Sequence, residues 1–215
     1  MKKLKKLFYS CRKSGSNFLI VLLKHIFYRA KRKNIVADHN AIIKGVSNII
    51  IKGFLKVGIS PVGFTHNKDV TLLNVSGKLE ILGDVSIGRG CRFDIGNRGL
   101  VTLGNGTFIN PFTSVVIMHK LEIGENCAIS WNCQFLDEDF HKINYEGKKE
   151  FSDNGISIGN KVWIGTNVSI YKGTTIPSGC VIASNSVVKG VFSEENMLIA
   201  GNPAKILKKN ISWEV

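Results

Sequence analysis

A repeat of six residues in the second half of the chain constrains the fold more than any other feature of the sequence. From position 158 to position 188 a bulky aliphatic residue returns at every sixth position. The series consists of Ile158, Ile164, Ile170, Ile176, Ile182 and Val188. A helix with about 3.6 residues per turn would scatter this repeat around its circumference, whereas short strands joined by tight turns place every sixth residue on one inward face. The repeat therefore predicts a coil of short strands.

Three such strands bring the chain back to its start one strand spacing higher, about 4.8 Å, and pair in parallel with the coil below. Small or β-branched residues follow four positions after the bulky ones: Val162, Val168, Thr174, Cys180 and Ser186. A triangular prism can hold this alternation of large and small side chains in its core. Since the same spacing recurs in residues 81–93, 103–115 and 123–135, we predict a mainly β fold, a parallel β-helix about five regular coils and roughly 24 Å tall.

Four regions differ in pattern along the chain. We expect a basic, helical segment over residues 1–47, irregular β coils over 48–80, the regular β-helix over 81–198 and a C-terminal tail over 199–215. A polar insertion, residues 136–157, interrupts the repeat. Loops that leave a solenoid at one corner are common sites of binding chemistry, so we expect the functional site there.

The positive charge of the chain is concentrated at its N terminus. Residues 1–34 hold 11 of the 29 Lys and Arg residues and no acidic residue. Apolar residues recur at helical spacing on either side of Ser14-Gly15-Ser16, which predicts two short helices. The apolar run is too short to span a bilayer, which takes about 20 residues. The segment therefore either packs on the solenoid or on a partner subunit, or holds the protein on an anionic membrane surface.

Four of the five cysteines lie at the small inward position of the repeat: Cys91, Cys127, Cys133 and Cys180. There they fill space as small apolar side chains. No pair has the C-x-x-C spacing of metal ligands, and an odd number does not suit a disulfide framework. We therefore expect no metal and a reducing compartment, which means a cytoplasmic protein. Peripheral contact of this protein with the inner face of the cell membrane stays open.

The polar insertion carries one histidine in a setting that suits catalysis. Asp139 lies two residues before His141, and a carboxylate at that spacing can hold an imidazole as a base near neutral pH. The remaining histidines are expected to be solvated: His25, His39, His66 and His119.

Four features together resemble the hexapeptide-repeat acyltransferases. They are the repeat itself, the loop Asp139-Phe140-His141-Lys142-Ile143, the strand Val162-Trp163-Ile164-Gly165-Thr166 and the tail Ala200-Gly201-Asn202-Pro203-Ala204-Lys205. They occur in the family's order, and the galactoside and maltose acetyltransferases and the capsule O-acetyltransferases are closest in pattern. The resemblance implies a left-handed coil, an exception to the right-handed crossover rule. It also implies a homotrimer with active sites between subunits.

The resemblance further implies roles for individual residues. His141 takes the proton from the acceptor hydroxyl as that oxygen attacks the thioester of acetyl-CoA, and either Asp139 or a backbone carbonyl orients its ring. The resulting oxyanion needs a fixed N–H donor, for which the resemblance suggests the backbone around Trp163, whose indole either serves the site or only packs. Asn110 matches a residue that contacts the acceptor, although asparagine in a solenoid turn is often structural.

Coenzyme A has an apolar arm and three phosphates, and the resemblance assigns small residues to the arm and lysines to the phosphates. The matching positions are Thr166, Ala183, Ser184, Lys189, Lys205 and Lys208. Lys205 and Lys208 stand where the galactoside enzymes have arginine. This difference loses a bidentate contact but keeps the positive charge.

These observations predict an acetyl-CoA-dependent O-acetyltransferase that acts on a sugar hydroxyl in the biosynthesis of a cell-surface glycan such as capsule or O-antigen. The alternatives are an N-acetyltransferase of an amino-sugar nucleotide and a non-enzymatic, membrane-associated solenoid. A γ-class carbonic anhydrase would need a third histidine beside His119 and His141. Residues 1–34 are too few for the front domain of a serine acetyltransferase, and they contain no recognisable nucleic-acid-binding module.

Overall fold

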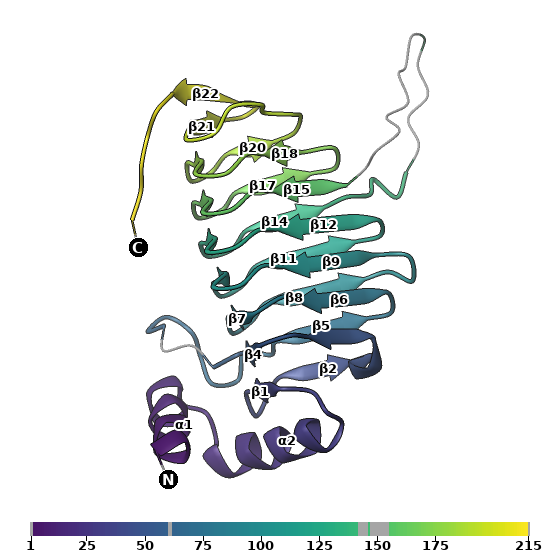
Figure 1. Cartoon of the computed structure of the whole chain (residues 1–215), viewed down its shortest axis with the longest axis vertical. Coiled ribbons are helices and arrows are strands. Elements are labelled where there is room, and N and C mark those ends of the chain that lie inside the picture. The colour runs from purple at the N-terminus through teal and green to yellow at the C-terminus, as the bar shows by residue number, and fades with distance from the viewer. Residues whose placement is uncertain (1, 60–61, 142–145, 147–154, 215) are drawn as a thin grey trace.

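The computed structural model describes residues 2–59, 62–141, 146 and 155–214. Two helices stand at one end of a tall stack of strands, and the chain climbs from them toward the C terminus coil by coil (Figure 1). The helical elements are α1 (Lys2–Ser14), α2 (Phe18–Ala30) and the short 3₁₀ turn η1 (Val46–Asn48).

Three sheets form the faces of a triangular prism. Sheet A consists of β1 (Ile35–Ala37), β4 (Phe54–Val57), β7 (Asp84–Ile87), β10 (Phe108–Ile109), β13 (Ala128–Ile129), β16 (Trp163–Ile164), β19 (Val181–Ile182), β21 (Leu198–Gly201) and β22 (Ala204–Lys208). Sheet B consists of β2 (Ile42–Lys44), β5 (Leu72–Val75), β8 (Arg92–Ile95), β11 (Ser114–Ile117), β14 (Gln134–Leu136), β17 (Ser169–Tyr171) and β20 (Val187–Val188). Sheet C consists of β3 (Ile49–Ile51), β6 (Lys78–Ile81), β9 (Leu100–Leu103), β12 (Lys120–Ile123), β15 (Ile156–Ile158) and β18 (Thr175–Ile176).

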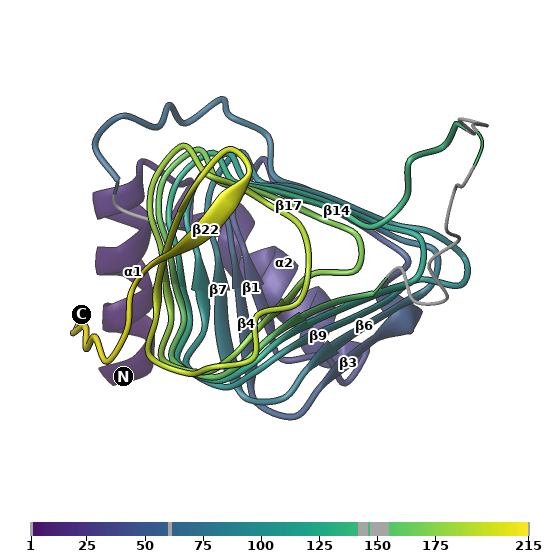
Figure 2. The same ribbon diagram turned by 90° about the horizontal axis from the view of Figure 1, so that it is seen from above.

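The coil is left-handed. In the view from the C-terminal end, the chain passes from sheet A to sheet B to sheet C in a clockwise direction while it rises toward the viewer (Figure 2). The neighbouring strands of successive coils pair in parallel, and only the last strand, β22, runs antiparallel to its neighbour β21. The expected left-handed parallel β-helix is therefore confirmed.

The core consists of columns of side chains that stack in register from coil to coil. In sheet B, Val115 pairs with Phe93 in the coil below and with Phe135 in the coil above, and all three side chains are buried. The smaller valine leaves room for the two aromatic rings. Burying each such side chain stabilises the fold by about 1.5–3 kcal/mol, so these columns hold the coils together.

The solenoid begins earlier than the expected boundary at residue 48. Strand β1 pairs with β4, so the first coil starts at Ile35. The reason is coil length. Trp163 pairs with Val181, eighteen residues later, whereas Ile35 pairs with Leu55 after twenty residues and Leu55 pairs with Val85 after thirty. This change of length between the first coils hides the repeat, so the regular coils expected over 81–198 are the visible part of a longer prism.

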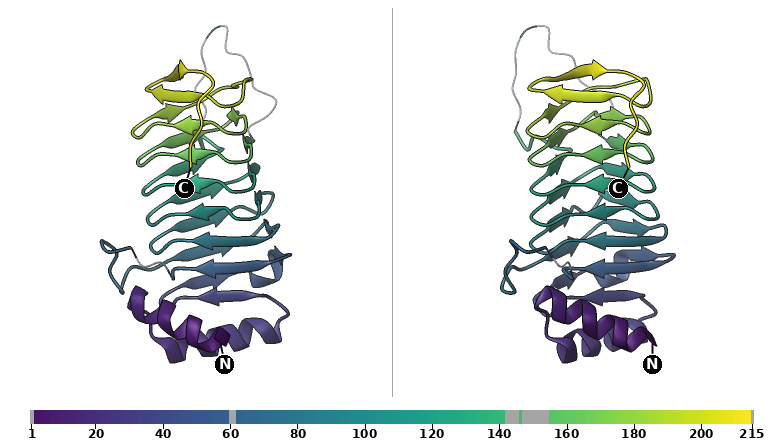
Figure 3. Two further views of the ribbon diagram at one scale, coloured as in Figure 1. Left: turned by 60° about the vertical axis from the view of Figure 1, so that its left-hand side comes forward. Right: turned by 90° about the vertical axis from the view of Figure 1, so that its left-hand side faces the viewer.

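The two helices expected around Ser14-Gly15-Ser16 are present at the base of the prism (Figure 3). Asn17 caps α2, since its side chain accepts a hydrogen bond from the Ile20 N–H. The ammonium group of Lys24 donates to the carbonyl oxygens of Asp38, His39 and Ala41 at 3.0, 2.7 and 2.8 Å and so ties α2 to the first coil. Among the described residues, neither helix is long and apolar enough to cross a membrane.

Candidate active site

The polar insertion leaves the prism at the corner between sheets B and C. Strand β14 ends there at Leu136, and β15 resumes sheet C at Ile156. The turns of the neighbouring coils at the same corner follow β11 below and β17 above. Part of the insertion, residues 142–145 and 147–154, lies outside the described residues. The segment that leads to His141 is described, and its contacts can be followed one residue at a time.

Asp137 fixes the start of the insertion. Its side chain is fully buried, and its carboxylate accepts hydrogen bonds from the backbone N–H groups of Met118, His119 and Lys120 at 2.7, 2.8 and 2.8 Å. Burying a carboxylate is costly unless it is hydrogen-bonded, and these three donors satisfy both of its oxygens. The insertion is therefore anchored to the turn after β11.

Glu138 links the insertion to His119, which the sequence had suggested was solvated. One carboxylate oxygen, Oε2, lies 2.9 Å from Nε2 of His119, and the other, Oε1, accepts the backbone N–H groups of Asp139 and Phe140. The hydrogen bond from His119 holds the pKa of Glu138 below its ordinary value, and the backbone donors act in the same direction. His119 thus belongs to the structure of the loop.

Asp139 is held by the coil above. Its carboxylate lies 2.8 Å from the ammonium group of Lys172, which follows β17 at the same corner. Phe140 adopts a left-handed backbone with a φ of 59°, and the His141 side chain that follows is exposed. Asp139 therefore pairs with Lys172, and of the two orienters expected for the ring of His141, Asp139 or a backbone carbonyl, this contact favours the carbonyl.

Trp163 lies on sheet A, across the prism from this corner. Its indole is 42% exposed, and Nε1 donates to the hydroxyl of Ser130 at 3.2 Å. The ring centroids of Trp163 and Trp213 are 6.2 Å apart, so the C-terminal tail packs against the same face. One side of the indole thus stays open to solvent while the other contacts the tail.

Three of the expected coenzyme A residues lie together at the corner between sheets A and B. Thr166 follows β16, and Ala183 and Ser184 follow β19 in the next coil. The N–H of Thr166 donates to the Ser184 hydroxyl at 3.1 Å. These turns carry small, partly exposed side chains, which leave the surface of this corner accessible.

The expected phosphate-binding lysines are divided between two places. Lys205 and Lys208 are exposed on β22, at the C-terminal end of sheet A. Lys189 is exposed in the turn after β20, at the corner between sheets B and C. Two of the three lysines thus lie on the same side of the prism as Thr166 and Ser184.

Asn110 has a structural use in its turn. Its side-chain Nδ2 donates to the carbonyl oxygen of Ile129 in the coil above at 3.0 Å, and the residue is half-buried. Its own carbonyl oxygen accepts a hydrogen bond from the Cys91 thiol. The structural alternative for Asn110 is therefore supported by its contacts.

Within one chain, His141 and the Thr166–Ser184 corner lie on different sides of the prism. The described segment after β14 leaves the prism at the corner opposite sheet A, while β22 belongs to sheet A (Figure 2). The residues expected to act on the acceptor and those expected to hold the donor are thus not brought together by this chain alone.

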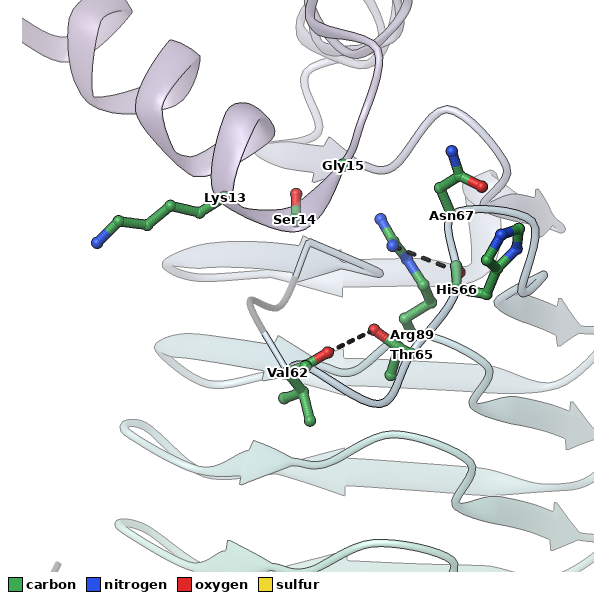
Figure 4. Close-up of a pocket in the computed structure, with 9 residues that line it drawn as sticks. Lys13, Ser14, Gly15, Val62, Thr65, His66, Asn67 and Arg89 are labelled. Carbon is green, nitrogen blue, oxygen red and sulfur yellow. Dashed lines mark hydrogen bonds between the residues drawn. The ribbon is translucent and has the colours of Figure 1, made fainter.

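A separate cavity of about 330 Å³ lies near the N terminus, between the end of α1 and the loop that contains Val62 and His66 (Figure 4). Arg89 lines it, and the guanidinium of this buried residue pairs with Asp38 at 3.0 Å and donates to the Ser16 hydroxyl at 3.1 Å. No residue that the sequence suggested for acetyl transfer lines this cavity. It is not the candidate active site.

Similarity to known proteins agrees with the repeat and with the fold. The family model for bacterial transferase hexapeptide (six repeats) matches residues 155–190. An uncharacterized 24.8 kDa protein in the cps region of Klebsiella pneumoniae is 39% identical over 207 residues, which cover 95% of this chain and 92% of that protein. The putative lipopolysaccharide biosynthesis O-acetyl transferase WbbJ of Escherichia coli K12 is 30% identical over 57% of this chain and 67% of that protein. A solved hexapeptide-repeat acetyltransferase of Vibrio cholerae, complexed with acetyl coenzyme A, is 28% identical with a TM-score of 0.46, over 56% of this chain and 64% of that chain.

Proposed function

Because this chain belongs to the hexapeptide-repeat acetyltransferases, we propose that it transfers the acetyl group of acetyl-CoA to a hydroxyl of a sugar in a cell-surface glycan. The observation that carries the proposal is the exposed His141 at the end of a turn that is bonded to the coils below and above. The relative that acts in lipopolysaccharide biosynthesis supports a glycan acceptor and an ester product.

In the proposed reaction, the imidazole of His141 takes the proton of the acceptor hydroxyl while the oxygen attacks the thioester carbon. The hydroxyl alone is far too weak an acid to lose its proton at neutral pH, so a base in place lowers the barrier. The tetrahedral intermediate then collapses, the carbon–sulfur bond breaks, and the coenzyme A thiolate takes the proton from the imidazolium. A backbone N–H near Trp163 is the proposed donor to the oxyanion.

The proposed donor site follows the corner between sheets A and B. Small side chains at Thr166, Ala183 and Ser184 leave room for the apolar arm of coenzyme A, and the ammonium groups of Lys205 and Lys208 attract its phosphates. Lys189, at the corner between sheets B and C, would contact a phosphate group from that side. As point charges, these lysines bind phosphate with less geometric specificity than arginine would.

We also propose a homotrimer, which the separation of the two groups supports. Since His141 and the donor corner lie on different sides of one prism, a complete site needs His141 from one subunit and the donor residues from its neighbour. Oligomers of identical chains are usually closed and symmetric, and a ring of three provides three equivalent sites of this kind.

The N-terminal helices are proposed to place the enzyme at the inner face of the cell membrane. Leu19, Leu23 and Ile26 of α2 are 67%, 66% and 56% exposed and recur at helical spacing, so they share one face. Basic side chains such as Arg12 and Arg29 are exposed on the same pair of helices. An apolar face beside basic residues is the pattern of helices that bind anionic lipid surfaces.

The test is a screen of acetyl transfer from acetyl-CoA to free sugars, sugar nucleotides, lipid-linked glycans and polysaccharides, read by mass spectrometry. The proposal expects one acceptor class to gain an ester-linked acetyl group, and His141→Ala to lower kcat by about 10²–10⁴. His66→Ala, which removes another exposed histidine, is the matched control and should keep normal activity. Unchanged kcat in His141→Ala, or acetylation of amines only, would refute the assignment.

A further inference from the structure

We infer that the acidic turn formed by Asp137, Glu138 and Asp139, together with His119 and Lys172, is a clamp that positions His141 for proton transfer. The inference rests on the proposed function, because it concerns how the base is held. In this inference the five residues position the base and do not take part in the chemistry. Each acts through the backbone or the charge that fixes the turn.

The lower half of the clamp is the contact with the turn after β11. Asp137 uses Oδ1 for the Met118 N–H and Oδ2 for the N–H groups of His119 and Lys120. An asparagine could accept through one oxygen only, and its NH₂ group would face a backbone donor. A carboxylate is therefore the side chain that fits this position, and the contact sets where the insertion begins.

The middle of the clamp is Glu138, which connects His119 to the backbone just before the base. Its Oε1 accepts the N–H groups of Asp139 and Phe140 at 2.9 and 3.3 Å, and its Oε2 meets His119 Nε2. These bonds favour the turn in which Phe140 takes its left-handed φ of 59°. The direction in which the chain enters His141 is thus tied to the Glu138 carboxylate.

The upper half of the clamp is the ion pair between Asp139 and Lys172. The lysine side chain is 20% exposed and the aspartate 60% exposed, so the pair lies at the surface but is supported from the solenoid side. Because Lys172 belongs to the coil above and His119 to the coil below, the turn is bonded to two rigid coils at once. Such support matters since a displacement of about 1 Å at a catalytic group can cost about 10²-fold in rate.

The test compares kcat and the acetyl-CoA KM in variants of the clamp. Glu138→Ala should lower kcat at least tenfold with little change in KM. Glu138→Gln should recover much of the loss, because its amide oxygen can still accept the N–H groups of Asp139 and Phe140. Asp139→Lys should lower kcat similarly, and the charge-swapped double variant Asp139→Lys, Lys172→Asp should restore it. Glu122→Ala is the matched control, because it removes only an exposed ion pair to the Lys120 ammonium group, while the bond of Lys120 to Asp137 comes from its backbone N–H.

Each outcome distinguishes the clamp from other roles. If the charge-swapped variant stays as impaired as Asp139→Lys, Asp139 contacts the imidazole or the acceptor directly and the clamp is overturned. The clamp is also overturned if the Glu138 and Asp139 variants keep wild-type kcat while His141→Ala is inactive. If His141→Ala is itself active, the proposed base is wrong, and the clamp fails with it. A clamp role also requires that the apparent pKa of the kcat profile stays unchanged in the variants, since the same imidazole accepts the proton.

Discussion

At the scale of single residues, the buried pair of Arg89 and Asp38 controls the junction between the helices and the solenoid. The guanidinium of Arg89 and the carboxylate of Asp38 are 3.0 Å apart, their side chains are 2% and 1% exposed, and Arg89 Nε has no partner among the described residues. Arg89→Met would leave the Asp38 carboxylate buried without its counter-charge, which costs about 3–5 kcal/mol. We expect the melting temperature to fall by on the order of 10 °C. Arg92→Met, on the exposed side of β8, should change it little.

The same pair predicts how the stability of the fold depends on pH. Burial acts to raise the pKa of Asp38, but hydrogen bonds from Ser16 and the Asn40 N–H and the charge of Arg89 outweigh it, so the pKa lies below its ordinary value. A carboxyl group with a lowered pKa in the folded state stabilises the fold above its unfolded pKa, and this contribution is lost as the pH falls through the folded pKa. Denaturant titrations between about pH 5 and pH 2 should show that the free energy of unfolding falls less on acidification in Asp38→Asn than in wild type. An equal loss in both proteins would contradict the prediction.

The cysteines give a second residue-scale prediction. All five are buried and free, and burial raises the pKa of Cys91 to about 12 and that of Cys133 to about 11. Since the thiolate is the reactive form, the native protein should not react with a thiol reagent at about pH 8, and five thiols should react after denaturation. Rapid reaction of Cys91, Cys127, Cys133 or Cys180 in the native protein would show that the coils open.

Residue roles at the B–C corner could be predicted only in part. His141 stands out because a carboxylate precedes it within a polar insertion. The role of His119 was missed, since its partner Glu138 is 19 residues further along the chain. The pairing depends on the register between coils, and the coil length changes here from twenty-two residues to twenty, so the sequence alone does not show it. The signal was that His119 and the insertion stand at the same corner of consecutive coils.

At the scale of elements, the proposed membrane contact of α2 can be tested without removing the helix. Val21 and Tyr28 are buried against the protein, so truncation would damage the first coil. We therefore expect the triple variant Leu19→Ser, Leu23→Ser, Ile26→Ser to stay folded and to lose flotation with anionic vesicles at low salt. Val191→Ser, at a residue that is 76% exposed at the other end of the prism, is the control and should float like wild type.

Salt separates the electrostatic part of this binding from the apolar part. Each basic residue near an anionic surface contributes about 1 kcal/mol, and salt screens this attraction. Wild type should therefore float less as salt rises and should not float with neutral vesicles. If the triple variant binds anionic vesicles as wild type does, the exposed face of α2 is used for something other than lipid.

The elements themselves were predicted where the pattern repeats. Strands from β15 to β20 follow from the repeat of residues 158–188, and the two helices follow from helical spacing. Strand β1 (Ile35–Ala37) was not predicted, because the coils that follow it differ in length, twenty residues from Ile35 to Leu55 and thirty from Leu55 to Val85. A strand of two or three residues is marked only by a series of equally spaced neighbours.

At the scale of the whole molecule, a trimer is the assembly proposed to complete the site. The chain has a mass of 23.7 kDa, so light scattering should give about three times that value at micromolar concentration. The mass should be independent of His141→Ala, because this exposed side chain is proposed to act on the substrate and not to hold subunits together. A fully active monomer would contradict both the trimer and the shared site.

A mixture of two inactive variants tests the shared site directly. One variant, His141→Ala, lacks the proposed base, and the other, Lys205→Glu with Lys208→Glu, repels the phosphates of coenzyme A at the donor corner. The two are co-expressed with different affinity tags, and trimers that carry both tags are isolated. In a closed ring of three, such a trimer contains one interface at which an intact His141 meets an intact donor corner, whichever variant is in excess. Activity should therefore return to about a third of wild type. If doubly tagged trimers stay as inactive as their parents, each site lies within one subunit, and the separation of His141 from the donor corner must be closed by a movement of the insertion in its own chain.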